Sequence, residues 1–152
     1  MNLFEEFIYK SGTLVAAELI FRMKYPRHVR LRDASDNFCL LSTNMVTVAP
    51  REEVGEIVSL PANGDYFLEG AEQLKPLIWG GARVESYRYL VNTECGVISG
   101  VRIDVAGGTL TVLAGMMPLS IFVALADKSW GQPEHQLSSY TETAAYKPAH
   151  PG

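Results

Sequence analysis

Short runs of the chain alternate between hydrophobic and polar residues, the pattern of a β-strand that is buried on one face. In the run 28–32, valine and leucine alternate with histidine and two arginines, and in 101–105 aliphatic residues alternate with Arg102 and Asp104. A shift of one residue would turn every apolar side chain to water, so this alternation sets the register. The predicted core comprises Val29, Leu31, Val101, Ile103, Leu110, Val112, Ile121 and Val123, with Arg30, Arg32, Arg102 and Asp104 on the opposite face.

Turn-forming residues divide these runs into strands. Ala106-Gly107-Gly108 predicts a tight hairpin turn before residues 109–113, because glycine adopts the positive φ that such turns require. Polar turn formers occupy residues 33–37 at the matching place earlier in the chain. We expect about eight strands in a mainly β fold, arranged as a curved sheet or a small barrel.

The order of these segments indicates an internal repeat. Residues 12–48 and 81–123 each contain a glycine-led apolar run, an alternating run and two further apolar runs. Matching segments lie roughly 70 residues apart in the sequence. We predict that the two spans form similar antiparallel β-meander units.

The remaining segments have other patterns. Residues 2–9 carry apolar side chains on one side and glutamates on the other, which predicts a short amphipathic helix capped by Asn2. Residues 50–80 have little periodicity and are interpreted as a linker between the two units. Residues 127–152 contain three prolines and predict an irregular polar tail. Its aromatic residues are expected to dock on the body or on a partner; they are Trp130, Tyr140 and Tyr146.

Length and composition agree with one folded domain. The chain has 152 residues, of which 47% are hydrophobic and 20% are charged, so it can bury a core and is not disordered throughout. We expect a single β-rich domain over residues 1–126, followed by the tail. The N-terminal residues lack the basic start and apolar middle of a signal peptide, and no apolar run is long enough to span a membrane, so we expect a cytoplasmic protein without membrane contact.

Charge is distributed unevenly along the chain, whose formal net charge is −4. A basic block occupies residues 22–32, and an acidic block occupies residues 52–72. Either the two blocks pair with each other or face water, or one of them attracts a partner of opposite charge. The candidate partner-binding residues are Glu52, Glu53, Glu56, Asp65, Glu69 and Glu72.

Several classes of site lack their usual sequence pattern. His28, His135 and His150 are widely spaced and neither cysteine belongs to a Cys-x-x-Cys pair, so we expect no metal site. No glycine-rich loop opens a helix, so we expect no phosphate-binding cofactor. Nucleic-acid binding is disfavoured, because the chain is acidic and Tyr25 is the one aromatic residue near the basic block.

Catalytic residues are also not indicated. Cys39 lies in an apolar strand and Cys95 in a turn without a basic neighbour, so neither is expected to be an activated nucleophile. Asp33, Glu85 and Asp104 lie on or beside predicted strands, and any two of them could converge in space as paired carboxylates. A solvated sheet face is the simpler interpretation.

One resemblance adds to this picture. The pattern of residues 101–110, followed by Leu113-Ala114-Gly115 and Ile121-Phe122-Val123, resembles small bacterial immunity proteins. The resemblance implies a stoichiometric inhibitor that binds and silences a toxin, with acidic residues against a basic toxin domain. It assigns no catalytic residue and no cofactor.

The main hypothesis is therefore a non-catalytic protein-binding module, and in particular a toxin-neutralising one. A small enzyme or a ligand-binding β-barrel, with a site formed only in space, is the first alternative. A homo-oligomeric structural subunit, such as a homodimer with strand edges paired between copies, is the second. A deep pocket lined by convergent polar groups would favour the first alternative.

Overall fold

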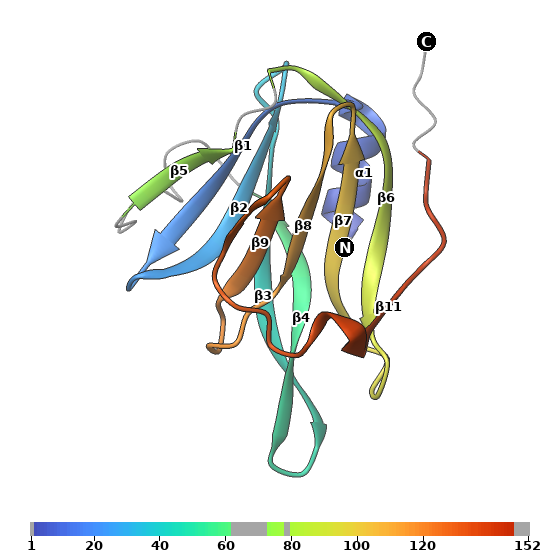
Figure 1. Ribbon diagram of the computed structural model, residues 1–152. Coiled ribbons are helices and arrows are strands. Elements are labelled where there is room, and N and C mark those ends of the chain that lie inside the picture. Colours follow the sequence, from blue (N-terminus) through green and yellow to red (C-terminus); the bar gives the residue numbers. More distant parts are fainter. Residues whose placement is uncertain (1, 62–72, 78–79, 148–152) are drawn as a thin grey trace.

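The computed structural model describes residues 2–61, 73–77 and 80–147, and these residues are mostly β (Figure 1). One α-helix, α1 (Asn2–Ser11), precedes the strands. It buries Phe4, Phe7 and Ile8, as the amphipathic pattern predicts. The strands are β1 (Thr13–Arg22), β2 (Tyr25–Asp33), β3 (Phe38–Ala49), β4 (Glu52–Pro61), β5 (Gln73–Leu77), β6 (Ala82–Asn92), β7 (Ile98–Val105), β8 (Gly108–Ala114), β9 (Ile121–Leu125), β10 (Lys128–Trp130) and β11 (Tyr140–Glu142).

Two antiparallel meanders form the body of the protein. Strands β1 to β4 are hydrogen-bonded in sequence order, and so are β6 to β9. The first strands of the two meanders pair with each other, at Thr13 with Arg83 and Leu14 with Ala82, so that a single sheet runs through both. Within the described residues its main path ends at β4 and β10 without closing, which makes it a folded open sheet rather than the small barrel that the sequence left open.

The hydrophobic core lies where the two halves of this sheet face each other. Strand β2 contacts β9, and β4 contacts β7 and β8, while α1 packs against β3 and β4. All eight predicted core residues are fully buried, which confirms the face assignment made from the alternation. On the opposite face, Arg30 is also buried, because Glu18 on the neighbouring strand pairs with its guanidinium at 2.8 Å and Phe38 lies under it.

The structure differs from the expected strand pattern in two places. The segment 50–80, interpreted as a linker, contains β4 and β5, so the described residues hold eleven strands rather than eight. Strand β4 lacks visible alternation because Val54, Gly55 and Ile57 are all buried. In addition, the two apolar runs at the end of the first repeat form one strand, β3, whereas their counterparts form β8 and β9.

Parts of the tail lie along the body. Strand β10 pairs with β9, and β11 pairs with β6 after a short 3-10 helix, η2 (Leu137–Ser139). Tyr140 is buried, and the ring of Tyr146 stacks on Tyr87 with a centroid distance of 5.2 Å. These aromatic residues therefore dock on the body. None of the helices in the described ranges is long and apolar enough to cross a membrane.

Candidate interaction surface at the β3–β4 hairpin

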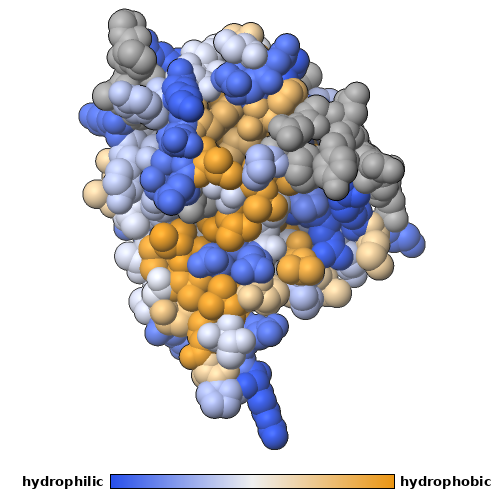
Figure 2. Space-filling view, turned by 180° about the vertical axis from the view of Figure 1, so that it is seen from behind, coloured by the Kyte–Doolittle hydropathy of each residue, from blue (hydrophilic) through white to orange (hydrophobic). Residues whose placement is uncertain are grey.

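The end of the β3–β4 hairpin projects beyond the other strands (Figure 1). The two strands are paired from Cys39 opposite Pro61 to Ala49 opposite Glu52, and Arg51 turns the chain with a positive φ of 64°. Figure 2, seen from behind, shows hydrophobic surface gathered above this projecting end. The acidic block thus begins on an ordered strand and not in an irregular linker.

Three of the candidate partner-binding carboxylates lie on this hairpin. Glu52 and Glu53 are exposed and Glu56 is partly exposed. Among the described residues, no side chain pairs with any of the three carboxylates, by a hydrogen bond or by an ion pair. The other three candidates, Asp65, Glu69 and Glu72, lie outside the described residues.

The basic block does not neutralise these carboxylates. Arg30 pairs with Glu18 at 2.8 Å, and Arg32 pairs with Asp36 at 3.3 Å. Within the described parts of the chain, no ion pair joins residues 22–32 to Glu52, Glu53 or Glu56. Mutual pairing of the two blocks is therefore not observed for these three residues.

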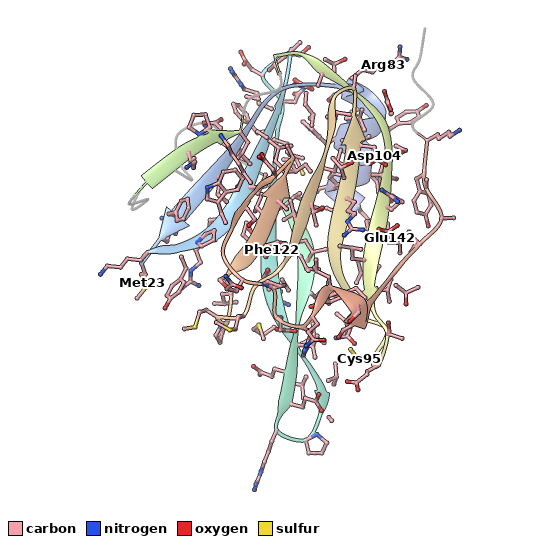
Figure 3. The ribbon with its side chains drawn as sticks, viewed as in Figure 1. Met23, Arg83, Cys95, Asp104, Phe122 and Glu142 are labelled. Carbon is pink, nitrogen blue, oxygen red and sulfur yellow. The ribbon has the colours of Figure 1, made fainter. Side chains whose placement is uncertain are left out.

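A cavity of about 380 Å³ adjoins the hairpin. Its wall combines aliphatic residues of the hairpin with polar groups from the end of β6, from the loop after it and from the tail. The charged and polar side chains include Glu52, Glu94 and His135, and Cys95 also lines the cavity; Figure 3 shows Cys95 at the end of the molecule from which the hairpin projects. The cavity thus extends the acidic surface of the hairpin inward.

Glu134 fixes the hairpin to the tail. Its two carboxylate oxygens accept hydrogen bonds from the backbone N–H of Gly55 at 3.0 and 3.1 Å, and His135 Nε2 lies 3.3 Å from the same carboxylate. On the other side of the same residue, the hydroxyl of Ser99 donates to the Gly55 carbonyl at 2.8 Å. Gly55 has no side chain here because a Cβ would lie 2.5 Å from that of Ala114. The sequence gives no signal for these contacts, since they join residues 44 and 79 positions apart.

The cysteines differ in their surroundings. Cys39 is buried in the core, and this burial raises the pKa of its thiol to about 12, so it stays protonated. Cys95 is half-buried and shares the acidic cavity with His135, a proximity that the sequence did not indicate because the two residues lie on different segments.

The carboxylates considered as catalytic pairs have separate partners. Burial alone would raise the pKa of Asp33, but hydrogen bonds from Ser11, Asn37 and Ser35 outweigh burial and hold this pKa below its usual value. Burial would likewise raise the pKa of Asp104, but hydrogen bonds from Ser86 and Thr109 and the charge of Arg88 lower it overall. Asp33 and Asp104 thus each have hydrogen-bond partners of their own, and Glu85 is exposed.

The described residues contain no cluster of three histidine, cysteine or carboxylate side chains that could hold a metal ion. Comparison of the chain with protein-family models, with curated proteins and with solved structures gave no match. Function must therefore be inferred from the surface itself.

Proposed function

We propose that the protein is a non-catalytic binding module that captures a basic partner protein with the end of its β3–β4 hairpin. The observation that carries this proposal is the group of carboxylates on the hairpin, Glu52, Glu53 and Glu56, which have no partner among the described residues. With Arg51 at the turn the projecting hairpin still carries more negative than positive charge, and such an excess attracts a partner of opposite sign over distances of about the Debye length, roughly 8 Å at physiological salt.

The adjoining cavity supports the proposal, because its chemistry suits a lysine or arginine side chain. Val48 and Val54 would contact the aliphatic stem of such a side chain, while Glu52 and Glu94 would face its charged end. A partner that first meets the exposed carboxylates would then be held by a basic residue inserted beside them. Toxin neutralisation is the specific case that the immunity-protein resemblance implies, with the toxin as the basic partner.

The proposal is tested by changing the three hairpin carboxylates together. The variant Glu52→Gln, Glu53→Gln, Glu56→Gln should bind the protein encoded by the neighbouring gene about tenfold more slowly at low salt, because electrostatic attraction acts mainly on the association rate. At high salt the difference should shrink. Stopped-flow mixing at two salt concentrations measures both rates.

A matched control removes the same charge elsewhere. Glu6→Gln, Glu85→Gln and Asp127→Asn change three exposed carboxylates outside the hairpin. This control should retain the association rate of the unaltered chain. Equal rates for the two triple variants, or no binding of the neighbouring gene's product by the unaltered chain, would overturn the proposal.

A further inference from the structure

A second and larger cavity lies away from the hairpin end, on the first meander. It has a volume of about 770 Å³, within the range of roughly 300–1,000 Å³ that is typical of small-molecule sites. Its wall is built on a row of cross-strand neighbours, with His28 on β2 opposite Ser42 on β3, and Ser42 opposite Val58 on β4. The β1–β2 turn and the loop between β8 and β9 complete the wall with Met23 and Leu119.

The charged residues that the structure describes in this cavity wall are basic. They are Arg22 and Arg27, and none of the described lining residues is an aspartate or a glutamate. The guanidinium of Arg27 donates to the neutral carbonyl of Pro118 at 3.3 Å, and its buried Nε has no acceptor among the described residues. The rest of the guanidinium is exposed and has no carboxylate partner among the described residues, so an anion that enters the cavity would be attracted to it.

The positive charges of the two arginines also affect His28, which lines the same cavity. Its Nδ1 lies 2.6 Å from the hydroxyl of Ser42. Burial, together with the positive charges of Arg22 and Arg27, lowers the pKa of His28 to about 4. The imidazole is therefore neutral at physiological pH and contributes hydrogen bonding rather than charge.

Two of the apolar residues that line the same cavity have a strained backbone conformation. Met23 and Leu119 adopt positive φ values of 52° and 66°, which branched or bulky residues rarely adopt. Both are exposed, Met23 at 71% and Leu119 at 48%, as is Leu60 on β4. Strained backbone that presents apolar groups to solvent beside a cavity is typical of a binding site.

We propose that this cavity binds a small amphipathic carboxylate, with its head group beside Arg27 and its aliphatic body against Met23, Val58, Leu60 and Leu119. The charge of the wall selects an anion, and the four apolar side chains select a body of several carbons. This site does not depend on the acidic hairpin, so it stands or falls separately from the proposed function.

Octanoate is a suitable probe, because it combines a carboxylate with an eight-carbon chain. Isothermal titration calorimetry should show saturable binding of octanoate to the full chain. Binding of 1-octanol, which lacks the charge, should be at least tenfold weaker, and so should binding of acetate, which lacks the body. Ring signals of His28 in NMR spectra should move with octanoate and localise it to this cavity.

Two substitutions distinguish this site from general anion binding. Arg27→Gln should weaken octanoate binding at least tenfold, and Arg27→Lys should retain most of it. Arg83→Gln, a control at an exposed arginine on β6 that Figure 3 shows at the other end of the molecule from the hairpin, should leave it unchanged. Absence of saturable octanoate binding to the unaltered chain, equal binding of octanol, or equal effects of Arg27→Gln and Arg83→Gln would overturn the proposal.

Discussion

Arg30 and Asp33 are charged residues that lie inside the folded chain, and each is held by several hydrogen bonds. Arg30 meets both carboxylate oxygens of Glu18, and Asp33 accepts from Ser11, Ser35 and Asn37. A buried charge without partners would be strongly destabilising, so these bonds are what allows both residues to be buried.

His28 is partly buried beside two arginines, and this makes the stability of the protein depend on pH. Its pKa is lowered to about 4 in the folded chain, against an ordinary value of 6.5. Between these values the unfolded chain binds more protons, so stability is fully present above about pH 6.5 and is lost as the pH falls toward 4. Urea unfolding at pH 7 and pH 5 should give a lower free energy of unfolding at pH 5.

The variant His28→Gln checks the origin of this pH dependence. Glutamine keeps hydrogen-bonding capacity but does not titrate, so the difference between pH 7 and pH 5 should become smaller. An undiminished difference in the variant would show that other groups cause it.

The alternation of hydrophobic and polar residues predicted which side chains point into the core. It did not predict how deeply the polar side chains on the other face are buried. Val29 and Ile103 are buried as expected, because period two fixes the face of a strand. The burial of Arg30 could not be predicted, since it depends on Glu18 from a neighbouring strand and on the Phe38 ring, over which the guanidinium lies. The cavity around His28 depends in the same way on segments that meet only in three dimensions.

At the scale of elements, the tail is joined to the body by side chains as well as by strand pairing. Glu142 on β11 forms ion pairs with Arg88 on β6 and Arg102 on β7, and Arg88 also pairs with Asp104 at 3.3 Å; Figure 3 labels both carboxylates. Glu134 contacts the hairpin through Gly55. The tail therefore contributes to holding β4, β6 and β7 in place.

Loss of the Glu134 contact should loosen β4 locally. In Glu134→Ala, hydrogen exchange of the Gly55 amide should accelerate at least tenfold, because hydrogen bonds to charged groups contribute about 1.5–3 kcal/mol. NMR-detected exchange measures this amide directly. Asp127→Ala, which removes an exposed carboxylate from the same segment, should leave the rate unchanged.

Strands with clear turns and alternation were predictable, whereas β4 was not. The hairpin of β7 and β8 follows from glycine at its turn, where Gly107 adopts a φ of 96°. Strand β4 is buried on both faces near Gly55, which removes the period-two signal that identifies a half-buried strand. The acidic block is visible in the sequence, but the position of Glu52, Glu53 and Glu56 on a projecting hairpin required the structure.

At the scale of the whole molecule, the strand order runs outward in both directions from the pairing of β1 with β6. Each meander contributes four strands from this central pairing, and β10 adds a further strand beyond β9. The main cluster of core residues draws on both meanders. Neither half can therefore bury its apolar face without the other.

Unfolding should consequently be a single transition. Amides of β3, from the first meander, and of β8, from the second, should lose protection from hydrogen exchange at the same urea concentration. Mass spectrometry of peptides from the two strands measures both in one experiment. Loss of protection in one strand at clearly lower urea would show that the two meanders are separate folding units.

The bonds at Gly55 also bear on how the protein behaves at high concentration. A strand at the end of a sheet carries unpaired backbone groups that can recruit another chain and so begin aggregation. At Gly55 both backbone groups are already taken, by Glu134 and by Ser99. A second copy could extend the sheet past β4 here only after displacing two side chains of the same molecule, so this contact protects the chain from polymerising through β4.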